Sequence, residues 1–149
     1  MHNTSDILKR PEAQGAALRV DAALPQVTFF HALRGATVVS ANTAEAIHAA
    51  TKELLTAMVT RNAIPVEAIA SIFFTVTPDL NAAFPAKAAR QLGWQHIALM
   101  CATEIAVPGA LPACLRVMMH FNAARPRDGY QPIYLHGAEQ LLADDPLES

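Results

Sequence analysis

Cysteine, glycine and histidine are too few or too scattered in this sequence to support several common chemistries. Only two of the 149 residues are cysteines, Cys101 and Cys114, so there is no disulfide framework and we expect two free thiols. The six glycines form no phosphate-binding loop, and the six histidines show no metal-ligand spacing with the cysteines. We therefore expect no nucleotide, no metal ion and no other cofactor.

An excess of charge of one sign and a long apolar run are also missing. The 11 basic and 13 acidic residues give a net charge of -2, which leaves no electrostatic footprint for nucleic acid or for an anionic membrane surface. No stretch of membrane-spanning length is free of charge or proline, and the first residues contain no apolar run of secretory length. These features predict a soluble, cytoplasmic protein.

The length and the 52% of hydrophobic residues are typical of one domain with a substantial core. Residues 1–26 contain polar, charged and alanine-rich segments that end at Pro25. We interpret them as an N-terminal extension that can be flexible, and the sequence does not indicate its role. A single domain is expected over residues 27–143, with a C-terminal tail over 144–149.

Hydrophobic periodicity predicts five strands and two helices. The first helix is expected to begin at a capping-box-like Asn42 with Glu45, and the second to run for about two turns between Pro85 and Gly93. The first strand is expected to end at Arg34 and Gly35. In chain order the elements are a strand at 27–34, a helix at 42–61, strands at 68–77, 96–101, 114–121 and 132–136, and the second helix between the second and third strands. This order predicts an α+β fold, a mixed sheet with helices packed on one face.

The other face of this sheet is predicted to be polar. Residue parity along the strands places Arg34, Arg116 and Tyr134 on it, because the alternate positions are apolar. Such a polar set fits a subunit interface or a cleft better than a dry core.

No nucleophile with an adjacent base can be assigned from the sequence, which leaves a set of cations as the candidate chemistry. Arg34, Lys87, Arg90 and Arg116, together with Tyr134, are groups that bind carboxylates, and they suit a small dianionic organic acid. Simpler explanations exist for several candidates. Lys87 and Arg90 fit a solvated helix face, Phe84 and Tyr134 ordinary packing, Glu104 a loop carboxylate and Cys101 a buried thiol.

Six short motifs together resemble one family, the monofunctional chorismate mutases of the AroH type. They are RGAT at 34–37, TPDL at 77–80, FPAKAAR at 84–90, GW at 93–94, C-x-x-E at 101–104 and CLRVMM at 114–119. The similarity covers about residues 28–136. It implies a homotrimer with active sites between adjacent subunits, and catalysis of the rearrangement of chorismate to prephenate in phenylalanine and tyrosine biosynthesis.

The resemblance also implies a role for each candidate residue. Arg116, Glu104 and Cys101 are the catalytic set, and the remaining residues bind substrate. By this resemblance Arg34 and Tyr134 hold a carboxylate, Arg116 reaches the ether oxygen, Cys101 and Glu104 position the ring hydroxyl, Phe84 and Leu141 form apolar walls, and Lys87 and Arg90 form a cationic rim.

The tail departs from the family pattern, because Leu142 stands where a basic residue is expected. Two other functions stay open at this point: a trimeric enzyme of the imine-deaminase type, and a non-catalytic regulatory trimer that binds a small carboxylate. Mixing Arg34→Ala with Arg116→Ala subunits tests whether these two arginines meet across a subunit interface.

Overall fold

The computed structural model describes residues 27–143; the predicted extension (1–26) and tail (144–149) lie outside the described residues. Among the described residues, no helix combines the length and apolar character needed to cross a membrane.

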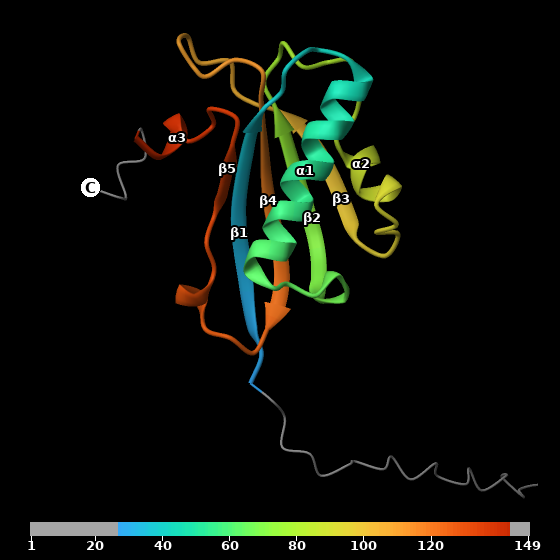
Figure 1. Ribbon diagram of the computed structural model, residues 1–149, viewed down its shortest axis with the longest axis vertical. Coiled ribbons are helices and arrows are strands. Elements are labelled where there is room, and N and C mark those ends of the chain that lie inside the picture. The colour runs from blue at the N-terminus through green and yellow to red at the C-terminus, as the bar shows by residue number, and fades with distance from the viewer. Residues whose placement is uncertain (1–26, 144–149) are drawn as a thin grey trace, which may run out of the picture.

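A five-stranded mixed sheet forms the centre of the fold (Figure 1). Its strands are ordered β3-β2-β4-β1-β5, with β4 antiparallel to both β1 and β2, while β2 pairs with β3 and β1 with β5 in parallel. The predicted element order is confirmed, and the structure adds a short third helix. The strands are β1 (Phe29–Val38), β2 (Ile69–Val76), β3 (Ala98–Thr103), β4 (Cys114–Ala123) and β5 (Ile133–Leu135); the helices are α1 (Ala44–Asn62), α2 (Ala86–Gln91) and α3 (Gln140–Ala143), with 3-10 turns at Val66–Ala68 and Arg127–Gly129.

Helix α1 covers one face of the sheet with an apolar stripe. Its buried residues include Ile47, Leu54, Leu55 and Met58, which recur at helical spacing. The helix begins one residue later than predicted, because the Thr43 hydroxyl accepts the N–H of Ala46 at 3.1 Å and is therefore the N-cap.

Asn42, the predicted start of α1, has a different function. Its side-chain oxygen accepts the backbone N–H groups of Asn81 and Ala82, each at 3.0 Å. Its side-chain amide donates to the Asn81 side chain at 2.8 Å. Asn42 thus ties the start of α1 to the loop that leads into α2.

Strand β1 continues to Val38, so the prediction that it ends at Arg34 and Gly35 is wrong. Gly35 lies inside the ladder, opposite Val117 on β4 and Ile133 on β5. A Cβ atom at Gly35 would lie 2.6 Å from the Met58 sulfur. The glycine therefore lets α1 pack closely against the strand, and it does not end the strand.

Within the described residues the second face of the sheet is bordered only by the short helix α3, and large apolar side chains are exposed on it. Phe73 on β2 lies between Met100 on β3 and Met118 on β4, and Met118 in turn pairs with Arg34 on β1. Met100 is 58% exposed and Phe73 39% exposed. This row, Met100–Phe73–Met118, is called the apolar row below.

Candidate active site

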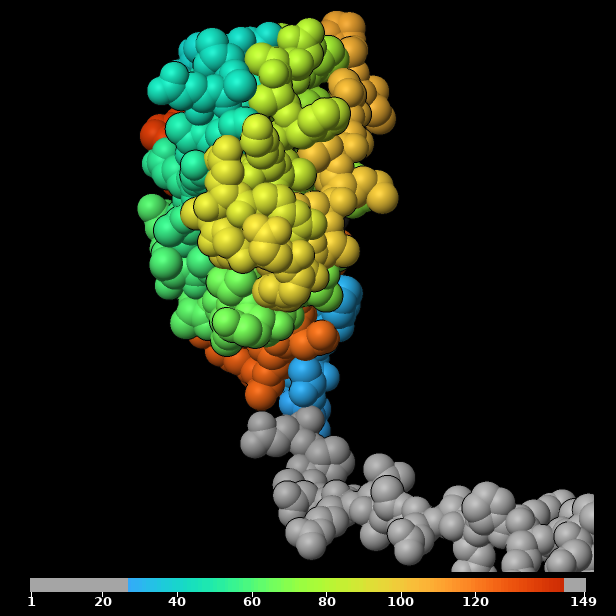
Figure 2. All heavy atoms as spheres, turned by 90° about the vertical axis from the view of Figure 1, so that its right-hand side faces the viewer, coloured from blue at the N-terminus to red at the C-terminus, as the bar shows by residue number. Residues whose placement is uncertain are grey.

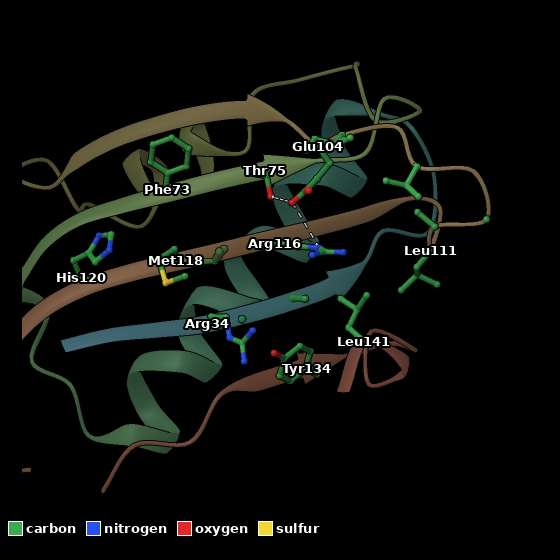
Figure 3. A pocket seen from close by; sticks show the side chains of 17 residues that line it. Arg34, Phe73, Thr75, Glu104, Leu111, Arg116, Met118, His120, Tyr134 and Leu141 are labelled. Atoms are coloured by element: carbon green, nitrogen blue, oxygen red, sulfur yellow. Dashed lines mark hydrogen bonds and ion pairs between the residues drawn. The ribbon is translucent and has the colours of Figure 1, made fainter. Parts of the chain in front are cut away.

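A cleft of about 850 Å³ lies on the face of the sheet opposite α1. The loop between β3 and β4 borders it, and Figure 2 shows this loop, in orange, projecting on the side away from α1. Its residues Ile105, Val107 and Leu111 give the cleft an apolar wall. The predicted residues that line the cleft are Arg34, Glu104, Arg116, Tyr134 and Leu141 (Figure 3).

Strand register brings the polar residues of the cleft together. Arg116 on β4 pairs with Ala36 on β1, and Ala36 pairs with Tyr134 on β5. Arg34 precedes Ala36 by two residues and therefore points to the same face. The small side chain of Ala36 leaves room for Arg116 and Tyr134 on either side of it. The prediction that these three polar residues share one face is confirmed.

Glu104 faces Arg116 directly. The Glu104 backbone N–H donates to the carbonyl of Val76 at 2.8 Å, which fixes the residue just beyond the end of β3. One side-chain oxygen, Oε1, lies 3.6 Å from Nε of Arg116 and accepts a hydrogen bond from the hydroxyl of Thr75. An anion and a cation are thus held side by side in the cleft.

Thr75 was not predicted as a site residue. The available signal was its position: a hydroxyl within the apolar run of β2, on the same parity as Phe73 and paired in register with Arg116. The run was interpreted only as a buried strand, although one side of β2 faces the cleft.

The start of β4 is fixed by the turn that follows β2. The Thr77 hydroxyl accepts the N–H of Cys114 at 2.9 Å, and the Asp79 carboxylate accepts the N–H of Ala113 at 2.7 Å. The hydrogen bond from Thr77 is the main cause that lowers the pKa of Asp79 below its ordinary value of 3.8; burial opposes it, and the N–H of Ala113 adds to the lowering. These bonds anchor the chain two residues before Arg116.

The other predicted site residues lie on α2 and β3 and do not line this cleft. Phe84 is 76% exposed, and Lys87 is exposed one turn further on. Cys101 pairs in register with the core residue Phe74 and faces α2; burial raises its pKa, so that it stays a thiol at neutral pH. Phe84, Lys87, Arg90 and Cys101 are called the α2 edge below.

Arg90 is bound within its own subunit. Its guanidinium donates to the backbone carbonyls of Trp94, Gln95 and Ile97 at 2.5 to 3.0 Å. These bonds close the loop between α2 and β3. Arg90 was expected on a solvated helix face or, by the resemblance, in a cationic rim, and this structural role was not predicted.

The charged and polar side chains of the cleft suit an organic anion. Within residues 27–143, no group of three or more histidine, cysteine, aspartate or glutamate side chains is arranged to hold a metal ion. The two cysteines are free, as predicted. The polar groups that line the cleft include two arginines, a phenol, a carboxylate, the Thr75 hydroxyl and the His120 ring.

Comparison with known proteins identifies the family. The family model for chorismate mutase type I matches residues 30–145. The chain is 47% identical to the chorismate mutase AroH of Thermus thermophilus over 118 residues, which cover 78% of this chain and 95% of that protein. It is 40% identical to the chorismate mutase AroH of Bacillus subtilis (strain 168) over 113 residues, 75% of this chain and 89% of that one.

A solved structure gives the same result. A chorismate mutase from Clostridium thermocellum superposes with a TM-score of 0.73 and is 52% identical; the match covers 74% of this chain and 98% of that chain. The resemblance found in the six motifs is therefore confirmed over the whole described domain, and the chain belongs to the type I chorismate mutase family.

Proposed function

We propose that the cleft binds chorismate and converts it to prephenate, with Arg116 as the principal catalytic residue. The observation that carries this proposal is the placement of Arg116 beside Glu104 in a cleft that also contains Arg34 and Tyr134. Family membership makes the chain a chorismate mutase, an isomerase, and favours this function over imine deamination or carboxylate binding alone.

The proposed reaction fits the groups that are present. A Claisen rearrangement is unimolecular and concerted, so it needs no nucleophile and no proton transfer, and the enzyme acts by holding a compact conformer and stabilising charge. As the C–O bond breaks, the ether oxygen becomes more negative and the ring more positive. Arg116 is placed to stabilise the first change and Glu104 the second, while Arg34 and Tyr134 hold a carboxylate.

We further propose that the α2 edge of a neighbouring subunit completes each cleft. Within one subunit the sheet runs through four strand spacings, about 19 Å, from β3 at one edge to Tyr134 on β5 at the other. Cys101 also faces the helix side of the sheet, away from the cleft. A small dianion therefore cannot touch both Cys101 and Tyr134 of the same subunit. Phe84 and the apolar row are exposed in the single subunit, as expected of surfaces that become buried in an assembly.

The assembly we propose is the homotrimer that the sequence resemblance implies. In that trimer Lys87 contributes a cation at the mouth of the cleft and Phe84 and Leu141 contribute apolar walls. Arg34 and Arg116 lie on paired strands of one subunit. The two arginines can therefore act in the same cleft without a contact across a subunit interface.

Incubation of the purified protein with chorismate tests the reaction. Loss of chorismate absorbance with formation of prephenate is the expected result. Chorismate binding without turnover would favour the regulatory alternative, and ammonia release from an imine without chorismate turnover would favour the deaminase.

Mixed trimers test the shared site. Arg116→Ala disables the cleft, and Phe84→Glu places a repelling charge on the α2 edge. If each site combines the cleft of one subunit with the edge of the next, a random mixture of the two inactive variants regains about a quarter of wild-type activity, because one site in four receives two intact halves. Mixing Arg34→Ala with Arg116→Ala is the control and should restore nothing, since both residues belong to one cleft.

A further inference from the structure

The side chain of Thr75 lies at the contact between Glu104 and Arg116. Thr75 and Arg116 are register partners on the antiparallel strands β2 and β4, so their side chains lie next to each other on the cleft face. The Thr75 hydroxyl donates to Oε1 of Glu104, the same oxygen that lies 3.6 Å from Nε of Arg116 (Figure 3). Both described side-chain interactions of Glu104 therefore converge on one oxygen.

This arrangement differs from the pairing that an arginine and a carboxylate adopt when unconstrained. An unconstrained pair favours the bidentate form, in which two guanidinium N–H groups bind two carboxylate oxygens. Here Glu104 is fixed at two points to β2, by its N–H to Val76 and by its side chain to Thr75. The carboxylate contacts Arg116 only from the Nε side, through one oxygen.

We propose that Thr75 is a positioning residue that keeps Glu104 out of a bidentate pair with Arg116. The proposal rests on the function assigned to this cleft above. With Oε1 engaged by Thr75, the second carboxylate oxygen stays available to the substrate. The terminal N–H groups of Arg116 are likewise not occupied by Glu104, so they can bind the ether oxygen as its negative charge grows.

Replacing Thr75 tests this role. Thr75→Val keeps the β-branched shape and removes the donor, so Glu104 can rotate onto Arg116. Because the loss falls on charge that develops in the transition state, we expect kcat to fall about 10- to 100-fold while KM changes less than about threefold. Thr75→Ser keeps the hydroxyl and should retain kcat within about threefold. Thr60→Val, on α1 across the sheet, is the matched control and should leave both constants unchanged.

A double-mutant cycle shows whether Thr75 acts through Glu104. In a Glu104→Gln background, adding Thr75→Val should change kcat by less than about twofold, because the group that Thr75 positions has already been altered. A full additional loss in the double variant would overturn the proposal. Thr75→Ala, which removes the donor without a bulky methyl group, gives a second test and should show the same split between kcat and KM.

The proposed function and the positioning role of Thr75 are refuted by different results. A wild-type protein without chorismate turnover would refute the proposed function. An active wild type whose Thr75→Val and Thr75→Ala variants fold with unchanged circular dichroism and keep wild-type kcat would refute the positioning role alone. A valine variant that loses activity only in proportion to folded protein, with serine equally impaired, would show that Thr75 is a packing residue and would also overturn the proposal.

Discussion

Removal of the Arg116 side chain is the most direct test of how the cleft accelerates its reaction. The side chain extends from β4 into the cleft and is 45% exposed, so it supports none of the core contacts made by its strand neighbours Leu115 and Val117. Arg116→Ala should therefore fold. It should bind substrate through Arg34 and Tyr134, and it should be nearly inactive.

The magnitude follows from the charge that the transition state develops. A full positive charge about 3 Å from about half a negative charge contributes about 3 kcal/mol at an effective dielectric constant of about 20. A lost hydrogen bond adds about 1 kcal/mol. The total, about 3 to 4 kcal/mol, corresponds to a fall in kcat of about 150- to 900-fold. Removing Arg116 also leaves Glu104 without its cation, which should raise KM for a dianion as well.

Two further substitutions separate charge from shape. Arg116→Lys keeps the cation but loses the planar fork, so it should recover only part of the activity. Citrulline at position 116 keeps planar donors and loses the charge, and it should remain slow. Initial rates of chorismate consumption, measured at several substrate concentrations on protein whose assembly mass has been verified, give kcat and KM for each variant. A citrulline variant with most of the wild-type kcat would refute electrostatic stabilisation and leave conformer selection as the source of the rate.

Four other substitutions test the surrounding structure. Arg90→Ala should lower the melting temperature by several degrees, because three backbone carbonyls lose their donor. Lys87→Ala should leave the melting temperature unchanged and raise KM, with a larger effect at low ionic strength. Equal melting temperatures of the two variants would contradict the structural role of Arg90. The pKa of Asp79 is lowered on folding, so its stabilisation is present above its ordinary value of 3.8 and is lost as pH falls through the folded value. Asp79→Asn should therefore be less stable at neutral pH and show a shallower loss of stability in acid, and urea titrations at several pH values measure both. Gly35→Ala should cost about 1 to 3 kcal/mol in unfolding free energy, because its Cβ would overlap the Met58 sulfur; a variant as stable as wild type would show that α1 can shift without cost.

Residue parity predicted the β4 face correctly because the alternation there is nearly complete. Leu115, Val117 and Met119 are buried, and Arg116 between them is exposed. The errors lie where one residue type has two uses. Gly35 was interpreted as the end of the first strand, but in the structure it lies within β1 and allows close packing against Met58. Such contacts between distant segments leave no local periodicity.

The composition of the cleft was harder to predict than its face. Arg34, Arg116 and Tyr134 follow from alternation along their own strands. Glu104 lies beyond the end of β3, and its direction depends on the hydrogen bond from Thr75 on a different strand. The role of Thr75 depends in turn on the register between β2 and β4, which the sequence of neither strand specifies alone.

The proposed shared site also constrains the symmetry of the assembly. A two-fold dimer could complete both clefts only if the cleft and the α2 edge belonged to one self-complementary patch, so that each subunit's cleft met its partner's edge. In the proposed homotrimer each cleft meets the edge of the next subunit, a head-to-tail contact, and three such contacts close into a ring. Light scattering at micromolar concentration should accordingly give three times the mass of the 16.0 kDa chain. A fully active monomer would refute the shared site, because a monomer has no neighbouring edge to complete its cleft, and a fully active dimer would refute the proposed trimer.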